Sequence, residues 1–420
     1  MYTYTKLFLG LFYLFFCCSC DGDSGEETVS PEKEFKVEEL AAKPVDKSNS
    51  AKLLMHYMSW FETKESSGNG QWGYHWTMNH SNPDIVGKNG KREIASHYYP
   101  LIGPYHSGDK DVIEYHLLLM KYAGVDGILI DWYGTYNLND YAIIHENAGQ
   151  LIAMLDKVGL EYAFVYEDRF LNNIVEAQLA STPVEAAKKD MVYLKNNHFG
   201  NSNYIQLDQK PLLMVFGPIT LKSPDQWISV FDESQTEPSF LTLWNQINEA
   251  GEVVVGEYAW VYKGQSYLED FYQTRIKELD FSIGSAYPGF EDFYAEAGVN
   301  AGIDWEISPL NGQTFKETLT LFKNSSLDWL QLITWNDFGE GTAIEPTDEL
   351  GFKYVEALQD FAEVSQNKDV FDVIYQLYQL RKLHKDNSSI QLQLDQAFYH
   401  FAALQPQEAK TIINSIKNKP

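Results

Sequence analysis

Two carboxylates lie three residues apart, directly after a strongly apolar run. The run from Trp329 to Ile333 has the character of a buried strand, and Asp337 and Glu340 follow it among aromatic and glycine residues. Cleavage of a glycosidic bond uses one carboxyl group as proton donor and a second as base or nucleophile. Aromatic side chains beside the acids suit the apolar faces of sugar rings. The spacing therefore predicts glycoside chemistry with Asp337 and Glu340 as the catalytic pair, although a loop with two solvated acids would read the same.

The residues around this pair carry a family resemblance. Trp335-Asn336-Asp337 with Gly339-Glu340 resembles the pattern of glycoside hydrolase family 71, and residues 340–342 followed by 344–346 resemble family 99. The resemblance covers about residues 52–358. It implies a barrel enzyme that cuts α-linked polysaccharides, α-mannan-like or α-glucan-like, from within. The alternative is a surface glycan-binding lipoprotein without catalysis, and a lyase on the same fold is a third reading.

The resemblance also implies roles for the two acids. Glu340 matches the family 99 general acid/base, and Asp337 matches the residue that assists attack by the substrate's own 2-hydroxyl, a route that retains configuration. Family 99 has Glu where this chain has Asp337. An inverting route, in which Asp337 activates water, is equally open, because the sequence does not give the carboxyl separation.

Other candidate residues follow the ends of the other predicted strands or lie in the Gly-rich loop 66–82. Each aromatic taken alone is more often a core residue, and Glu167 has Arg169 as a candidate ion-pair partner. We expect the following residues to bind substrate: Tyr57, Trp60, Trp76, Asp131, Trp132, Glu167, Trp260, Tyr287, Trp335 and Asn336.

The chain lacks the signals of other catalytic classes. Its histidines show no HExxH spacing, and no Gly-x-Ser-x-Gly run follows a strand. All three cysteines, Cys17, Cys18 and Cys20, lie in the first twenty residues, so none is left in the body for a thiolate metal site. We therefore expect neither a metal nor a cofactor.

Eight short apolar runs alternate with stretches of helical length. This alternation predicts a parallel sheet, and eight repeats over roughly 300 residues fit an α/β fold of the closed (β/α)8 TIM-barrel type. An open doubly wound sheet is less favoured, because no glycine-rich phosphate loop follows the first strand. The predicted strands are 53–57, 127–131, 162–166, 211–216, 241–244, 258–261, 281–285 and 330–334.

The remaining segments complete the domain organisation. Residues 51–362 are assigned to the barrel, and residues 363–420 have helical spacing and predict a small C-terminal helical appendage. Residues 21–50 are acidic and polar and predict a flexible tether.

The first twenty residues read as a secretory signal. Lys6 precedes an apolar run from Leu7 to Phe16 that is too short to span a bilayer. The segment resembles a bacterial lipoprotein signal of the Bacteroidetes surface type, with Cys20 as the lipidated residue. This implies a lipid anchor in the outer membrane or at the cell surface, with the periplasm as the alternative.

The net charge restricts the partners. A formal charge of −27 disfavours nucleic acid and anionic membrane surfaces, and it also disfavours strongly acidic glycans. A neutral polysaccharide or oligosaccharide is the expected partner, and we expect the protein to be a monomer.

Overall fold

A computed structural model of the protein describes residues 35–417. The chain divides into two units, Met1–Lys36 and Val37–Pro420, and the description below concerns the second. The predicted signal segment 1–20, with its lipidation site Cys20, lies outside the described residues. Residues 21–34 of the predicted tether also lie outside them.

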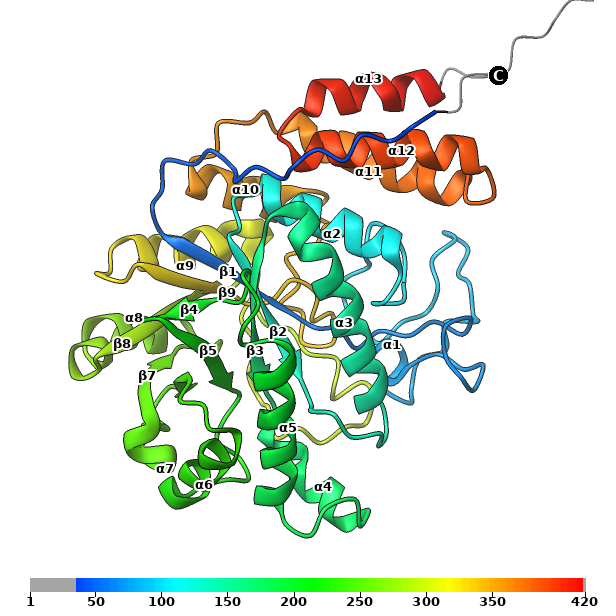
Figure 1. Ribbon diagram of the computed structural model, residues 1–420. Helices are drawn as coiled ribbons and strands as arrows, with labels where there is room; N and C mark the ends of the chain where they lie inside the picture. Colours follow the sequence, from blue (N-terminus) through cyan, green and yellow to red (C-terminus); the bar gives the residue numbers. More distant parts are fainter. Residues whose placement is uncertain (1–34, 418–420) are drawn as a thin grey trace, which may run out of the picture. The chain divides into compact units, whose positions relative to one another are not determined.

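Eight parallel strands close into a barrel, as the sequence predicted (Figure 1). Each strand pairs with its neighbour in the order β3-β2-β1-β9-β8-β7-β6-β5, and the pairing of β3 with β5 closes the ring. The two-residue β4 adds to β5 in antiparallel fashion outside the ring. The strands are β1 (Lys52–Tyr57), β2 (Gly127–Trp132), β3 (Glu161–Tyr166), β4 (Gln206–Leu207), β5 (Lys210–Val215), β6 (Ser239–Leu243), β7 (Val254–Tyr258), β8 (Phe281–Ala286) and β9 (Trp329–Leu332).

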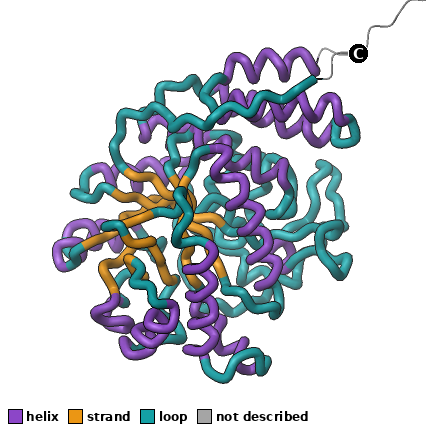
Figure 2. The backbone as a smooth tube through the Cα atoms, in the orientation of Figure 1, coloured by secondary structure: helices purple, strands orange, loops and turns teal. Residues whose placement is uncertain are grey.

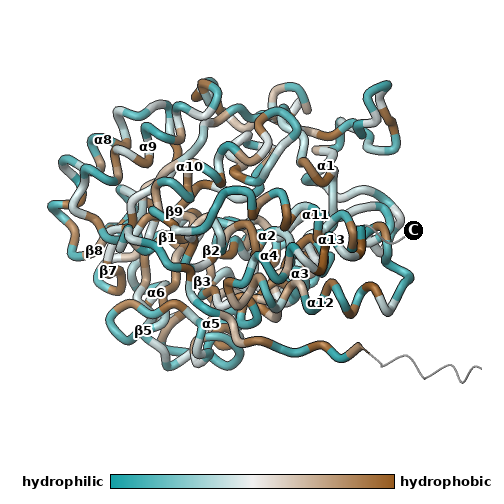
Figure 3. Tube along the Cα trace, turned by 90° about the horizontal axis from the view of Figure 1, so that it is seen from above, coloured by the Kyte–Doolittle hydropathy of each residue, from teal (hydrophilic) through white to brown (hydrophobic). Residues whose placement is uncertain are grey.

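Helices surround the strands (Figure 2). Hydropathy alternates along the outer helices, as expected when one face packs on the barrel (Figure 3). No helix between residues 35 and 417 is both long and apolar enough to cross a membrane. The α-helices are α1 (Tyr74–Thr77), α2 (Lys110–Tyr122), α3 (Tyr141–Val158), α4 (Leu171–Glu176), α5 (Pro183–Asn197), α6 (Pro224–Ser234), α7 (Ile247–Ala250), α8 (Gln265–Gln273), α9 (Gln313–Lys323), α10 (Lys353–Ala362), α11 (Asp369–Leu383), α12 (Ser388–Ala402) and α13 (Pro406–Lys417). Short 3-10 turns are η1 (Asp168–Phe170), η2 (Gly251–Val253), η3 (Arg275–Glu278) and η4 (Leu310–Gly312).

Strand β7 is the one strand whose predicted position is largely wrong. The sequence predicted residues 258–261, whereas the strand is Val254–Tyr258. Glu257 and Gly256 interrupt the apolar pattern there, so the true strand was missed. Gly256 is needed because a Cβ atom at this position would lie 2.1 Å from the Phe281 carbonyl oxygen. Glu257 is fully buried because Arg275 binds it through two nitrogens, at 2.8 and 2.9 Å.

Residues 38–50 differ from the predicted flexible tether. This segment runs beside the C-terminal helices (Figure 1), where the Glu38 amide donates to Gln396 at 2.7 Å and the Lys43 amide donates to the Ala402 carbonyl at 3.0 Å. Lys47 then pairs with Asp126 at 2.5 Å, at the start of β2. The segment is held by these backbone and side-chain bonds, which its polar composition does not reveal.

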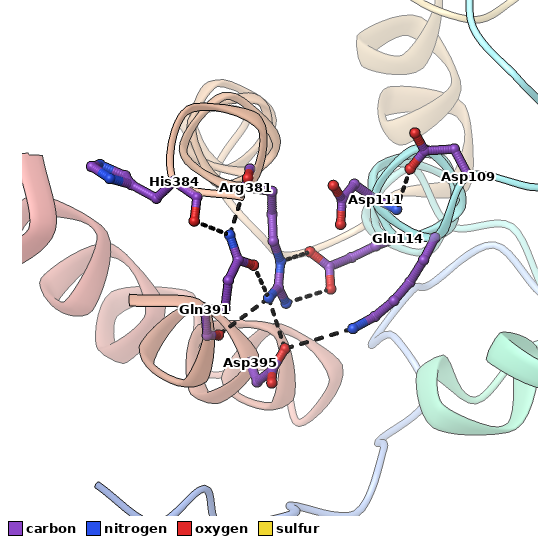
Figure 4. Close-up of polar contacts among 8 residues, drawn as sticks. Asp109, Asp111, Glu114, Arg381, His384, Gln391 and Asp395 are labelled. Atoms are coloured by element: carbon purple, nitrogen blue, oxygen red, sulfur yellow. Dashed lines mark hydrogen bonds and ion pairs between the residues drawn. The ribbon is translucent and has the colours of Figure 1, made fainter. Parts of the chain in front are cut away.

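Helices α11 to α13 form the C-terminal appendage and pack through α11 onto α2. Arg381 of α11 is 1% exposed and lies between Glu114 of α2, at 2.8 Å, and Asp395 of α12, at 2.7 Å (Figure 4). Removing one partner of such a buried pair typically costs about 3–5 kcal/mol. This ionic contact fixes the appendage to the side of the barrel.

Candidate active site

A cavity of about 210 Å³ opens where the barrel strands end at their carboxyl side. Its residues lie at the ends of β1, β2, β3, β5, β7, β8 and β9 or in the loops that follow them, which is the usual position of active sites in (β/α)8 barrels. The lining residues are His56, Met58, Trp60, Tyr74, His75, Met78, Asp131, Tyr133, Glu167, Arg169, Phe170, Phe216, Trp260, Tyr294, Asp337, Gly339 and Glu340.

The loop after β9 is tied to the loop after β1. The Trp335 amide donates to the His56 carbonyl at 2.7 Å. The Asn336 side chain then pairs with the Met58 backbone, donating to its carbonyl and accepting from its amide, both at 2.9 Å. Asn336 is fully buried, so it positions the loop and does not contact a ligand, contrary to the prediction.

Asp337 and Glu340 lie on one tight turn. The Asp337 amide donates to Thr334 Oγ1 at 2.8 Å, and Asp337 Oδ1 accepts the Glu340 amide at 2.9 Å. The Glu340 carboxylate accepts the Tyr294 hydroxyl at 3.0 Å. The turn is fixed at both acids, so the two carboxylates enter the same cavity with little freedom.

Gly341 allows a neighbouring loop to approach this turn. Its φ is +67°, and a Cβ atom would lie 2.6 Å from the Glu291 carbonyl oxygen. The close approach lets the Glu291 amide donate to the Glu340 carbonyl at 3.0 Å and the Phe293 amide donate to the Gly339 carbonyl at 2.9 Å. These bonds bring Tyr294 to the acid pair.

A fully buried polar network lies behind the turn. Glu345 accepts the Tyr105 hydroxyl at 2.7 Å and lies 3.2 Å from His116 Nε2. His116 Nδ1 is in turn 3.0 Å from the Tyr57 hydroxyl. Because the Asn336 amide donates to the Tyr105 hydroxyl at 3.0 Å, the network supports the residue next to Asp337.

Four carboxylates and one guanidinium share the cavity: Asp131, Glu167, Asp337, Glu340 and Arg169. Burial, and then repulsion from Glu167, raises the pKa of Asp131 well above its usual value. Burial raises the pKa of Glu167 to about 7, although Arg169, 2.7 Å away, opposes the rise. Glu167 therefore titrates near neutral pH, and the protonated form of Asp131 persists well above the usual carboxyl range.

The acid pair is perturbed in the same direction. Burial, and then the negative charge of Glu340, raises the pKa of Asp337 strongly. Burial also raises the pKa of Glu340, while the hydrogen bond from Tyr294 and the charge of Arg169 oppose that rise. Two interacting acids of this kind titrate together, so the pair retains a proton above the usual carboxyl range.

Aromatic side chains form the walls. Trp60 stacks on His75 with ring centroids 4.0 Å apart, and Trp260 packs edge-on against both His56 and Phe216 at 4.8 Å. The buried polar atoms of lining residues that have no hydrogen-bond partner among the described residues include His56 Nε2, Trp60 Nε1 and Asp131 Oδ2. Burial lowers the pKa of His56 to about 4, so its imidazole is neutral at pH 7. The cavity thus offers apolar faces and unused polar atoms together, which suits a polyhydroxylated ligand.

Six predicted site residues line the cavity: Trp60, Asp131, Glu167, Trp260, Asp337 and Glu340. The other six are fully buried away from it: Tyr57, Trp76, Trp132, Tyr287, Trp335 and Asn336.

The predictions for five buried aromatics are wrong for reasons of packing. Trp76 donates to the Tyr105 carbonyl at 2.8 Å and stacks on Phe61 in a small second core, so it is not a sugar platform. Trp132 faces outward and bonds His145, because side chains alternate along β2 and its neighbours take the cavity side. Tyr57 bonds His116, Trp335 packs against the same imidazole, and Tyr287 is covered within the main core.

The sequence reasoning missed several lining residues. Alternation along β1 would have found His56, because Tyr57 faces the opposite side. Tyr294 comes from the long loop between β8 and α9, and Phe216 follows β5 directly. The loop has no periodic pattern, so no sequence signal placed Tyr294 beside Glu340.

No group of three or more His, Cys, Asp or Glu side chains within residues 35–417 is arranged to hold a metal ion.

Comparison with known proteins gives three findings. The sequence model described as Glycosyl hydrolase family 99 matches residues 49–239. A glycoprotein endo-alpha-1,2-mannosidase-like protein of Danio rerio is 30% identical over 87 residues, and a glycoprotein endo-alpha-1,2-mannosidase of Xenopus laevis is 29% identical over 87 residues. Each alignment covers 19% of this chain, and the chain spans about a fifth of the length of these curated relatives.

Two solved structures share the fold. The GH99 endo-alpha-mannosidase from Bacteroides thetaiotaomicron aligns with a TM-score of 0.56 at 17% identity, covering 77% of this chain and 98% of that one. A structure described as a glycoside hydrolase-like protein aligns with a TM-score of 0.55 at 15% identity, covering 80% and 98%.

The closed barrel has the fold of these two structures, and its carboxylate-lined cavity lies at the usual position of a barrel active site. Residues 49–239, a little under half of the chain, resemble glycosyl hydrolase family 99.

Proposed function

We propose that the protein hydrolyses α-linked polysaccharide, α-mannan-like or α-glucan-like, by cleavage within the chain. The observation that carries the proposal is the presence of Asp337 and Glu340 on one rigid turn inside one cavity, with the pKa of both carboxyls raised. A raised carboxyl pKa keeps a proton available for the leaving oxygen near neutral pH. α-Mannan is the first substrate to test, because the relatives named above are endo-α-mannosidases.

The proposed chemistry gives each acid one role. Glu340, in its protonated form, donates its proton to the glycosidic oxygen as the bond to the anomeric carbon breaks. Asp337, in its ionised form, accepts a proton from the group that attacks that carbon. The attacking group is the substrate's own 2-hydroxyl in a retaining reaction or a water molecule in an inverting one. Analysis of the anomer formed first distinguishes these two routes.

The assignment of Glu340 as donor rests on its longer and more exposed side chain and on the family motif. The stronger rise in the pKa of Asp337 favours the opposite distribution of the shared proton in the empty site. A bound sugar changes that balance, because it displaces water and brings its own hydroxyls to Asp337. The kinetic comparison at the end of the Discussion tests the donor role directly.

The walls of the cavity support sugar binding. Trp60 and Trp260 offer ring faces, and Asp131 offers a buried oxygen without a partner among the described residues. The ion pair of Glu167 with Arg169 adds further hydrogen-bonding atoms at the rim. A ring bound between these groups would lie beside the acid pair.

The test is digestion of a panel of polymeric α-mannans and α-glucans, with sizing of the products. Ladders of oligosaccharides from one polymer support cleavage within the chain, whereas release of single sugars alone contradicts it. Asp337→Asn is the control that identifies contaminating activity. Binding of a polymer with no product would replace the hydrolase proposal with the glycan-binding one.

We also propose that the mature protein is a monomer anchored by a lipid on Cys20 in the bacterial outer membrane or at the cell surface. The proposal rests on the sequence of the first twenty residues. Cys20→Ala should release the protein from the detergent-soluble membrane fraction or block its maturation. Unchanged partitioning would contradict the anchor.

A further inference from the structure

A second pocket, of about 450 Å³, lies at the carboxyl ends of β6 and β7, beside the catalytic cavity. Its lining combines aromatic and polar side chains from the loop after β6, the loop after β7, helix α8 and the 3-10 turn η3. Those the argument uses are Trp244, Asn245, Tyr262, Tyr267, Asp270 and Arg275. The mechanism described above uses none of them.

Two tyrosines of this pocket, Tyr262 and Tyr267, are among the exposed large hydrophobic residues of the described chain. Tyr262 is 38% exposed and Tyr267 is 47% exposed, and their rings pack edge to face at 4.8 Å. Tyr262 also packs edge to face on Trp305 at 5.7 Å. Lys263 Nζ lies over the Tyr262 ring, 5.3 Å from its centroid, and the remaining exposed ring surface of the two tyrosines is available to a ligand.

The turn after β6, which carries Trp244 and Asn245, is held by hydrogen bonds to a buried carboxylate. The carboxylate of buried Glu257 accepts the backbone amides of Asn245 and Ile247, both at 2.9 Å. Arg275 binds the same carboxylate through two nitrogens. These bonds fix the turn that carries Trp244. Because the turn is already ordered, a ligand that binds the Trp244 ring causes little further loss of conformational entropy in the protein.

The polar groups of the pocket suit a neutral ligand. Arg275 is the one guanidinium in its wall, and it is already paired with Glu257 and with Glu278, at 2.7 Å. Asp270 adds a negative charge, and the chain as a whole carries −27. An anionic sugar would be repelled, whereas hydroxyl groups can bond Asp270 and the side-chain amide of Asn245.

The pocket and the catalytic cavity share the loop that follows β7. Trp260 lines the cavity and Tyr262, two residues further, lines the pocket. Two residues span at most about 7 Å. The distance from Trp260 to Tyr262 is therefore within the length of an oligosaccharide of a few sugar units.

We propose that this pocket is a remote subsite for the same neutral α-linked glycan chain, with the tyrosines and Trp244 as platforms for sugar rings. The proposal rests on the proposed function and extends it. Such a subsite binds polymer more tightly than short substrates, and it favours cleavage within a long chain over cleavage at its end.

The test uses the double variant Tyr262→Ala/Tyr267→Ala, whose side chains are exposed, so a normal thermal transition is expected. Leu383→Ala, at a 72% exposed position on α11, is the control for loss of an exposed apolar side chain. Steady-state kinetics are measured on polymeric α-mannan and α-glucan and on aryl α-glycosides of the same single sugars. Affinity electrophoresis in gels containing the polymers measures binding without catalysis.

The double variant should raise KM for the cleaved polymer roughly tenfold or more, since about 1.4 kcal/mol corresponds to a factor of ten. Its kcat/KM on the aryl glycoside should remain within about twofold of the parent value, because a single sugar unit with its aryl group is too short to extend from the catalytic cavity into the pocket. Gel retardation by polymer should be lost in the double variant and retained in Leu383→Ala.

Equal KM values on polymer for parent and double variant would overturn the subsite while leaving the hydrolase proposal intact. Retardation of the parent by polymer and its loss in the double variant, without any cleavage, would support the subsite and contradict the hydrolase proposal. Absence of retardation of the parent by every polymer would overturn the subsite.

Discussion

Replacing Glu167 with glutamine should change how the protein's stability depends on pH. Glu167 is 8% exposed in the cavity, and burial raises its pKa from 4.5 to about 7. Arg169, its ion-pair partner, has a side chain that is 41% exposed, so loss of the pair itself costs little. The substitution therefore removes mainly a buried carboxylate that resists ionisation.

The sign follows from proton binding. Between pH 4.5 and about 7 the folded protein holds a proton on Glu167 that the unfolded chain has lost. The free energy of unfolding that Glu167 contributes is therefore fully present below pH 4.5 and is lost as the pH rises through 7. A rise of this size corresponds to roughly 3 kcal/mol. Removing Glu167 also relieves the repulsion that raises the pKa of Asp131, which acts in the same direction.

The assay is urea unfolding of the parent and of Glu167→Gln at several pH values from 4 to 8. The difference in unfolding free energy should move in favour of the variant by up to about 3 kcal/mol across this range. Glu233→Gln, at an exposed position on α6, is the control and should run parallel to the parent. A Glu167→Gln curve that also runs parallel to the parent would refute the account of the carboxylate cluster.

Two further substitutions test the turn that carries the acid pair. Tyr294→Phe removes the hydrogen bond that stabilises ionised Glu340, so the pKa of Glu340, already raised by burial, should rise further. The basic limb of the kcat/KM profile should then move to higher pH, and an unmoved limb would argue against Glu340 as the proton donor. Gly341→Ala should lower the free energy of unfolding by about 1–3 kcal/mol, because φ is +67° and the new methyl group meets the Glu291 backbone. Gly149→Ala, in an exposed turn of α3 with no atom within 4 Å of the added Cβ, should be neutral or stabilising by comparison, and equal losses in both would contradict the packing argument.

Much of the barrel could be read from the sequence because its strands are buried on both faces. Strand β2 has all six residues buried, and such continuous apolar runs stand out between helical segments. Strand β7 escaped because Glu257 is buried by its ion pair with Arg275, a contact that no local pattern records.

The acid pair could be predicted for the same reason as the strands. Asp337 and Glu340 follow directly after an apolar run, so the position of a strand end located them. Successive side chains of a strand point to opposite faces, and strict use of this alternation would have selected His56 in place of Tyr57. His56 lines the cavity, whereas its neighbour Tyr57 does not.

Residues contributed by loops were the least predictable part of the site. Trp76 and Tyr294 both belong to long loops, yet Trp76 is core and Tyr294 bonds Glu340. Which of them meets the cavity depends on tertiary packing, such as the close approach at Gly341, and not on the loop's own composition.

The measurement that tests the central claim most directly compares Glu340→Gln and Asp337→Asn on two substrates. One is the natural α-linked glycan, and the other carries a leaving group that departs without protonation. Glu340→Gln should lose about 10²–10⁴ in rate on the natural glycan and far less on the activated substrate. Asp337→Asn should lose rate severely on both, because its assistance to the attacking group does not depend on the leaving group. Near-parental turnover of the natural glycan by either variant would contradict the assignment of Asp337 and Glu340 as the catalytic pair, and the reverse pattern would exchange their roles.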